Sequence, residues 1–161
     1  MSTILTDYDA ALEYEGILSM EPDWVILEIP QSVHDTITKN LGVAIKPNKH
    51  PHISVIKEEQ PNINQSDWDS KKFQGEKIKF KVSGKGNYEN GFHVWFDCYS
   101  PRLCEIREHF ALPVLKKDGV YQVNFHTTVG KLVRPVTPQL RKQYRLSKRT
   151  HIDVLTLMQH I

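Results

Sequence analysis

Two short segments of the chain carry a histidine followed, two positions later, by a hydroxyl residue: His52 with Ser54, and His126 with Thr128. Alternate side chains of a β-strand point to the same face, so each segment, as a strand, presents one imidazole and one hydroxyl together. Imidazole has an ordinary pKa of about 6.5, so near neutral pH one histidine can accept a proton while another donates one. Two such proton transfers, with hydroxyl groups donating hydrogen bonds to charged oxygens, suit the cleavage of a phosphodiester.

We therefore predict that His52 and His126 are the paired general acid and base, and that Ser54 and Thr128 hold the phosphate oxygens. The two histidines cover both proton transfers, so the chemistry demands no metal and no cofactor. A single His-x-Ser/Thr segment arises often by chance, and a lone strand histidine is usually structural. Two copies at matching positions, 74 residues apart (126 − 52), favour the catalytic interpretation.

Each histidine segment ends the same order of elements, which is strand, helix and strand. In the first copy the apolar run 24–29 (WVILEI) predicts a buried strand closed by Pro30. Ser32 predicts the cap of a helix over 33–41, and the run 52–56 (HISVI) predicts the strand that carries the first histidine.

The second copy repeats this order. The run 92–98 (FHVWFDC) predicts a strand, and Ser100 predicts the cap of a helix over 102–112 with Pro101 in its first turn. A strand over 122–129 then carries the second histidine. The repeat predicts an α+β fold of two antiparallel-sheet lobes related by a pseudo-twofold axis, with outer helices, in which the histidine strands meet face to face in a central cleft.

Other segments complete the prediction. The alternating run IKFKVSGKG predicts a half-exposed strand that ends at Gly84, and the polar stretch 57–76 predicts a loop around a short element at Trp68. The tail predicts a helix over 139–145 and a last strand over 152–158. Residues that alternate with the motif side chains, or follow them, are expected to face the core: Ile53, Val55, Thr127 and Val129.

The segments HISV at 52–55 and HTTV at 126–129 match the tandem His-hydrophobic-Ser/Thr-hydrophobic signature of the 2H (two-histidine) phosphoesterase superfamily. The resemblance runs from about Trp24 to Leu132 and includes the position of Lys131, where relatives often carry a basic residue. It implies a bilobal fold around one cleft and metal-free cleavage of RNA-like phosphodiesters. The residues that the family motif carries over are His52, Ser54, His126 and Thr128.

Within the superfamily, the small single-domain format most resembles the bacteriophage nucleases that counter CBASS, a bacterial antiviral defence. That resemblance implies cleavage of cyclic di- or trinucleotide signals in the cytoplasm of the host cell. The alternative is processing of short RNA ends, as by RNA 2′,3′-cyclic phosphodiesterases and the so-called 2′-5′ RNA ligases. The ligase group usually continues its first motif into a Leu-Gly stretch, whereas Val55-Ile56-Lys57-Glu58 stands here, which disfavours that subgroup.

A nucleotide substrate needs flat side chains for its bases and cations for its phosphates. Tyr14, Trp68 and Tyr88 lie in predicted loops or near turns and are the candidates for base stacking. Trp24 and Trp95 lie in predicted strands and are expected to pack in the core. The candidates for phosphate contact are Lys131 and Arg134, at the start of the basic stretch 131–149.

The composition fits one domain over residues 1–161, with 39% hydrophobic and 25% charged residues and a net charge of +2. We expect no membrane span and no targeting segment, because no apolar run is long enough and the N-terminal segment is acidic. Cys98 and Cys104 give neither a disulfide framework nor a metal-type spacing, which favours a reducing cytoplasm.

Two other classes of function remain open at this stage. A catalytically silent nucleotide-binding module is disfavoured by the intact His52 and His126. The run His50-Pro51-His52, with Glu58 beyond it, is similar to the metal ligands of cupins, although the spacing of the Glu is wrong for that class. A metal-dependent protein of the cupin type would lose its activity in the presence of a chelator. Base preference, ring size, linkage and oligomeric state are not set by the sequence.

Overall fold

The computed structural model describes residues 13–39, 45–47, 50–89, 93–123, 125–132 and 149–152. These residues form an α+β fold in which an antiparallel sheet predominates, so the predicted fold class is confirmed at that level. The predicted helix over 139–145 and nearly all of the predicted strand over 152–158 lie outside the described residues.

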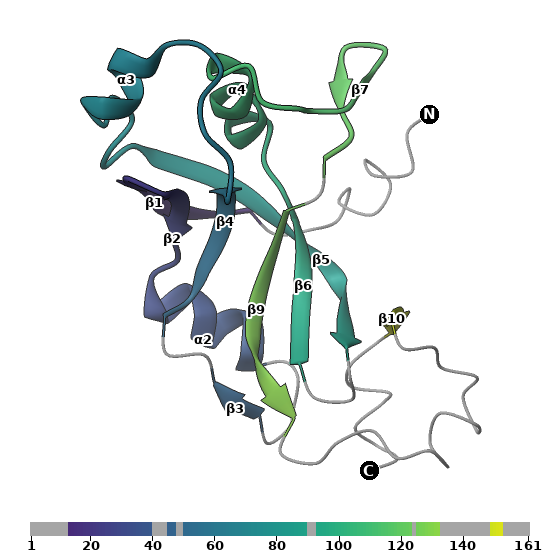
Figure 1. Ribbon diagram of the computed structural model, residues 1–161. Coiled ribbons are helices and arrows are strands. Elements are labelled where there is room, and N and C mark those ends of the chain that lie inside the picture. The colour runs from purple at the N-terminus through teal and green to yellow at the C-terminus, as the bar shows by residue number, and fades with distance from the viewer. Residues whose placement is uncertain are drawn as a thin grey trace.

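The described elements follow one another along the chain with short connections (Figure 1). The helices are α2 (Gln31–Lys39), α3 (Gln65–Asp69) and α4 (Pro101–His109). The strands are β1 (Glu13–Glu21), β2 (Trp24–Glu28), β3 (Ile45–Pro47), β4 (His52–Lys57), β5 (Lys77–Glu89), β6 (His93–Tyr99), β7 (Lys116–Lys117), β8 (Val120–Tyr121), β9 (Phe125–Leu132) and β10 (Arg149–Ile152).

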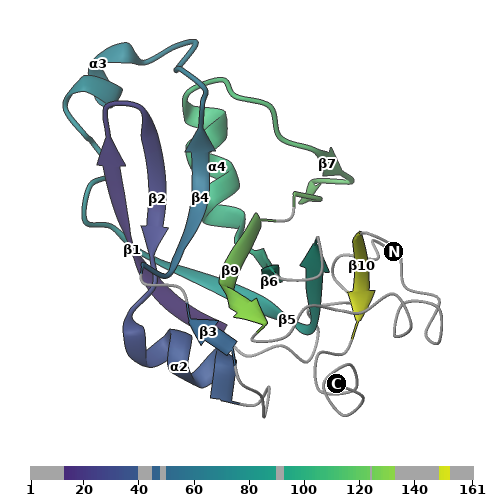
Figure 2. The same cartoon turned by 60° about the horizontal axis from the view of Figure 1, so that its bottom comes forward.

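The sheet closes on itself. Its strand order is β1-β2-β4-β9-β6-β5, and β1 also pairs with β5, which gives a barrel-like ring of six antiparallel strands. The long β5 crosses behind the other strands, while β4 and β9 lie side by side in the middle of the molecule (Figures 1 and 2). Short β3 extends the ring along β9, β10 adds to β5, and β7 pairs with β8.

The strand order is symmetric about the β4–β9 pair. One half of the ring is β1-β2-α2-β4 and the other is β5-β6-α4-β9, so the predicted repeat of strand, helix and strand is present, with one further strand before each copy. That further strand in the first half, β1, was not predicted. The ring closes where β1 lies between β2 and β5, and there Gly16 is essential, since a Cβ on it would lie 2.7 Å from the carbonyl oxygen of Glu28.

Local details differ from the prediction. Helix α2 begins at Gln31 because the Pro30 carbonyl accepts the amides of Val33 and His34 (3.0 and 3.1 Å), so Ser32 lies inside the helix and the predicted cap is wrong. Ser100 occupies the N-cap position of α4 with Pro101 in the first turn, as predicted, but its hydroxyl donates to the carbonyl of Lys79 (2.8 Å) and makes no hydrogen bond to the helix. Strand β5 continues beyond Gly84 to Glu89, with irregular pairing between Val82 and Gly86.

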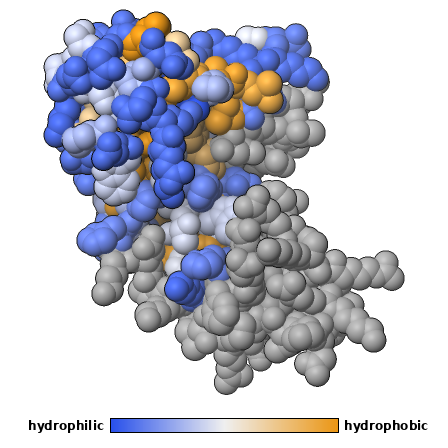
Figure 3. All heavy atoms as spheres, in the orientation of Figure 1, coloured by the Kyte–Doolittle hydropathy of each residue, from blue (hydrophilic) through white to orange (hydrophobic). Residues whose placement is uncertain are grey.

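The core fills the inner side of the ring and the space beneath α4. The expected core positions Ile53, Val55 and Val129 are buried, at 0%, 3% and 0% exposure. Both cysteines are free and buried, and burial raises the pKa of both thiols, that of Cys104 to about 11. They are therefore packing groups that stay protonated, as expected. Exposed apolar surface gathers on the side of α4 and β7 in Figure 3, where Leu115 is 64% exposed.

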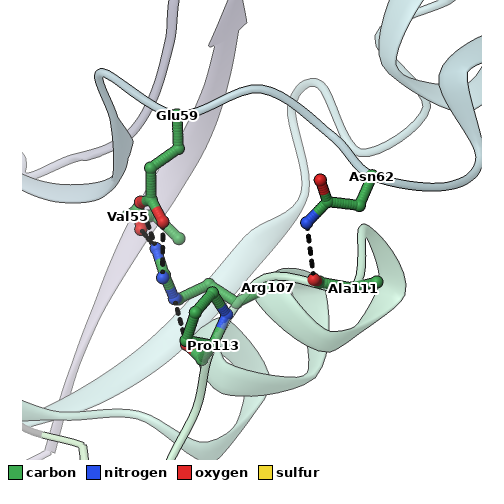
Figure 4. A network of polar contacts seen from close by, with 6 residues as sticks. All are labelled: Val55, Glu59, Asn62, Arg107, Ala111 and Pro113. Carbon is green, nitrogen blue, oxygen red and sulfur yellow. Dashed lines mark hydrogen bonds and ion pairs between the residues drawn. The ribbon is translucent and has the colours of Figure 1, made fainter.

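Arg107 of α4 ties the second half of the ring to the first (Figure 4). Its guanidinium donates to the carbonyl of Val55 (2.9 Å), to both carboxylate oxygens of Glu59 (2.8 and 3.0 Å) and to the carbonyl of Pro113 (3.0 Å). The Arg107 side chain is only 13% exposed, so its charge-assisted bonds to Val55 and Glu59 are partly shielded from water. The hydrogen bond from Arg107 holds the pKa of Glu59 below its ordinary value.

The loop after β4 completes this connection. The Asn62 side chain donates to the carbonyl of Ala111 (2.9 Å; Figure 4), and the Asn64 side chain donates to the carbonyl of His109. His109 is the last residue of α4 and Ala111 lies two residues beyond it, where no further helical turn supplies amides to these carbonyls. The loop therefore fixes the position of α4 relative to β4.

We predict that Arg107→Met lowers the free energy of unfolding by about 2–4 kcal/mol, because it leaves the Glu59 carboxylate and the Val55 carbonyl without their donor. The control is Arg102→Met, which breaks the more exposed pair with Glu76 and costs about 1 kcal/mol. Urea unfolding followed by circular dichroism measures both. Equal losses in the two variants would contradict a special role for Arg107.

Candidate active site

The two histidine segments lie on neighbouring strands of one sheet. Ile53 of β4 pairs with Thr127 of β9, and continuing this antiparallel register by one residue on either side sets His52 against Thr128 and Ser54 against His126. These four side chains share the face turned away from the core, which we call the outer face. Ile53 and Thr127 point inward and are fully buried, as predicted.

The relation between the strands corrects one expectation. The two strands do not meet face to face across a gap; they lie edge to edge. Residues directly opposite on such strands are about 5 Å apart and diagonal ones about 7–8 Å. His52 and His126 are diagonal neighbours, so the spacing between their positions leaves room for one phosphate group between two imidazoles.

A carboxylate lies beside each histidine, on the strand that flanks the β4–β9 pair at that side: β2 beside β4, and β6 beside β9. Glu28 of β2 is opposite His52, and Asp97 of β6 is opposite His126. The outer face therefore carries two rows across four strands. Glu28, His52, Thr128 and Trp95 form one row, and Ile26, Ser54, His126 and Asp97 form the other.

Sequence reasoning missed these carboxylates. The available signal was an acid at the same position of the two segments, the fifth residue of WVILE in β2 and of HVWFD in β6.

A β-bulge in each histidine strand brings a lysine to the outer face. Val55 of β4 has no partner in β2, and Val129 of β9 has none in β6. Beyond this extra residue, the side chains that point to the outer face are one position further along the strand. Lys57 and Lys131 consequently lie on the same face as the histidines, although they are an odd number of residues away. Both are exposed.

Lys131 was predicted at the site and Lys57 was not. The signal was that the repeat extends over six residues, as HISVIK and HTTVGK, with lysine last in both copies. Strict alternation would have turned both lysines toward the core. Their place on the outer face therefore depends on the two bulges.

The imidazole ring of His52 is oriented by the backbone just before β4. Its Nδ1 lies 2.7 Å from the carbonyl oxygen of His50, and because a carbonyl can only accept, Nδ1 carries the proton. In the neutral ring Nε2 is then the basic nitrogen. His50 thus contributes through its backbone, whereas its side chain is exposed.

Two tryptophans predicted in the core lie beside the histidines instead. Trp24 is 43% exposed, and its ring centroid lies 6.4 Å from that of His52. Trp95 is half-buried, and its centroid lies 6.4 Å from that of His126. The prediction failed because both tryptophans stand in continuous apolar runs, WVIL and VWF, which hide the alternation between the two faces.

Two of the predicted base-stacking residues, Tyr14 and Trp68, are not brought to this face. Tyr14 packs on Phe80, at the β1–β5 pair across the ring from the histidine strands. Trp68 is only 6% exposed and meets Phe110 edge-on, so it belongs to the core and the stacking prediction for it is wrong. Tyr88 lies in β5 opposite Val94, and Arg134 lies outside the described residues.

No metal site and no membrane span is found in the part of the chain that the structure describes. Within it, no three His, Cys, Asp or Glu side chains are grouped to hold a metal ion, and no helix is long and apolar enough to cross a membrane. No family model, curated protein or solved structure gives a significant match to the chain. The interpretation of the site therefore rests on the chain's own sequence and geometry.

Behind the sheet, His34 of α2 is buried at 1% exposure and lies near the backbone of Val129. Among the described residues neither ring nitrogen has a hydrogen-bond partner of good geometry. Burial lowers the pKa of His34, and the nearby Asp35 and the Val129 backbone offset only part of that effect. The folded protein therefore holds His34 neutral at a pH where the unfolded chain protonates it.

We predict that the free energy of unfolding falls as the pH drops below about 6.5, the ordinary pKa of histidine, because the unfolded chain then binds a proton that folded His34 does not. The stabilisation is complete above that pH and is lost toward the lowered pKa. His34→Leu should flatten this dependence in urea unfolding at pH 5.5, 6.5 and 7.5. His93→Gln, at an exposed histidine, is the control, and equal slopes in His34→Leu and wild type would refute the prediction.

Proposed function

We propose that this chain is a metal-independent phosphodiesterase of the 2H type, with its two pseudo-symmetric halves as the two lobes. The observation that carries the proposal is the pairing of Ile53 with Thr127, which sets the two His-x-hydroxyl segments on neighbouring strands with their side chains on one face. Two imidazoles and two hydroxyls converge there from segments 74 residues apart (126 − 52), beside two lysines and two carboxylates.

The reaction follows from these groups. One histidine removes the proton of a ribose 2′-hydroxyl, whose oxygen attacks the adjacent phosphorus and forms the new P–O2′ bond. The P–O5′ bond breaks, and the other histidine gives its proton to the leaving 5′-oxygen. The products are a 2′,3′-cyclic phosphate and a free 5′-hydroxyl, with no net gain or loss of protons.

The remaining groups stabilise the charge that develops on the phosphate. Ser54 and Thr128 donate hydrogen bonds to its non-bridging oxygens, and the cations of Lys57 and Lys131 balance the negative charge. Each histidine thus has the hydroxyl of the other half opposite it, so both halves contribute to every proton transfer.

The substrate that we propose is a cyclic di- or trinucleotide signal, in keeping with the resemblance to the bacteriophage nucleases that counter CBASS. The enzyme would then act in the cytoplasm of the host cell. Processing of short RNA ends is the alternative within the same chemistry, and the assay below separates the two.

We predict that the protein cleaves 3′,3′-cyclic di- or trinucleotides in the presence of EDTA, and that His52→Ala and His126→Ala each lower kcat at least about 100-fold, the usual contribution of a general acid or base. The products are resolved by liquid chromatography, and a 2′-deoxy substrate, which lacks the nucleophile, should not be cut. Cleavage of 2′,3′-cyclic RNA ends alone would favour the alternative. Unchanged rates in both alanine variants, or activity only with added metal, would reject the mechanism.

We also predict that Lys57→Gln lowers kcat/KM about tenfold and weakens the dependence of kcat/KM on ionic strength, because a phosphate loses one charge-assisted contact. The matched control is Lys79→Gln, at an exposed lysine of β5 on the far side of the ring, which should have no effect. Steady-state kinetics at 50 and 300 mM salt provide the measurement. An unchanged kcat/KM in Lys57→Gln would remove that lysine from the site.

A further inference from the structure

We propose that Trp24 and Trp95 are platforms for two nucleobases, one on either side of the scissile phosphate. The inference rests on the proposed function and narrows its substrate to a phosphodiester that joins two nucleosides. Its basis is the pair of ring contacts on the outer face, Trp24 with His52 and Trp95 with His126, each at a centroid distance of 6.4 Å.

The two contacts arise from different positions of the repeat. Trp95 is opposite Thr128, and its counterpart in the first half is Ile26, which is opposite Ser54. Trp24 is opposite Lys57, and its counterpart in the second half is His93, opposite Lys131. The internal symmetry of the fold alone would place tryptophans at equivalent positions. Each histidine nevertheless has one indole beside it.

Both indoles reach the surface, Trp24 as an exposed side chain and Trp95 as a half-buried one. Trp24 is 43% exposed, whereas its neighbours Val25 and Leu27 on the inner face are fully buried. The rings meet the histidines at steep angles of 71° and 66°, so the imidazole covers at most one face of each indole. A nucleobase can stack on the other face, and such stacking contributes about 1–3 kcal/mol per base.

The positions of the two tryptophans define the shape of the substrate. Trp24 lies on β2 and Trp95 on β6, with the two histidine strands between them. Three strand spacings of about 4.8 Å separate β2 from β6, or about 14 Å. Bases held that far apart cannot stack on each other, so the substrate binds with its bases splayed outward and its phosphate between the histidines.

The test is the binding of the 2′-deoxy analogue of 3′,3′-cyclic di-AMP, measured by calorimetry. This analogue lacks the attacking hydroxyl and is therefore not cut by the proposed route. Trp24→Leu and Trp95→Leu should each raise Kd about 5- to 150-fold, which corresponds to the stacking energy of one base. Trp24→Phe and Trp95→Phe keep a flat ring and should restore most of the affinity. Trp68→Phe changes the buried tryptophan and should bind as the wild type does.

A one-base ligand completes the test. For 2′,3′-cyclic AMP, only one of the two leucine substitutions should weaken binding. Circular dichroism checks that both leucine variants are folded. If both then bind the cyclic dinucleotide with wild-type affinity, the platform proposal is overturned, even if the protein cleaves the substrate. Binding that depends on both tryptophans without any turnover would support the platforms and reject the proposed phosphodiesterase.

Discussion

The pairing of Ile53 with Thr127 is the contact on which the rest of the structure depends. It is the point where the two halves of the chain join, and its antiparallel register decides which side chains of β4 and β9 become neighbours. A shift of one residue would turn the histidines into the core and the isoleucine and threonine to the outside. The cost of burying two imidazoles and exposing the apolar row makes that alternative unfavourable, so the core itself fixes the arrangement of the outer face.

The two bulges are the second constraint on the arrangement of the outer face. A side chain from a helix of the opposite half lies beside each of them. Arg107 of α4 donates to the carbonyl of Val55 in β4, while His34 of α2 lies near the backbone of Val129 in β9. The guanidinium of Arg107 donates a hydrogen bond to its bulge, whereas the buried imidazole of His34 has no hydrogen-bond partner of good geometry among the described residues. The halves are therefore alike in topology and unlike in the chemistry that holds them together.

The strands that carry the two histidine segments, and the face on which the motif side chains lie, could be predicted from the sequence. The residues around them could not. Alternation along a strand is a local property, so it correctly placed Ile53 and Thr127 inside and the four motif side chains on one face. A bulge depends on the partner strand, which is why the outward position of Lys57 was not found. The run WVILE hid Trp24 because only its ends are exposed, and Trp68 looked like a loop residue because its core contact, Phe110, comes from a distant helix.

The closed ring also has a consequence for how the molecule forms. Its decisive contacts are long-range in sequence: Thr127 pairs with Ile53, and Phe80 pairs with Tyr14. Closing such long loops costs chain entropy before any contact compensates for it, and folds of this type reach the native state slowly, in milliseconds to seconds. During synthesis the first half can pair β1 with β2 and β2 with β4, yet it holds only one histidine segment. The site is complete only when β9 lies between β4 and β6.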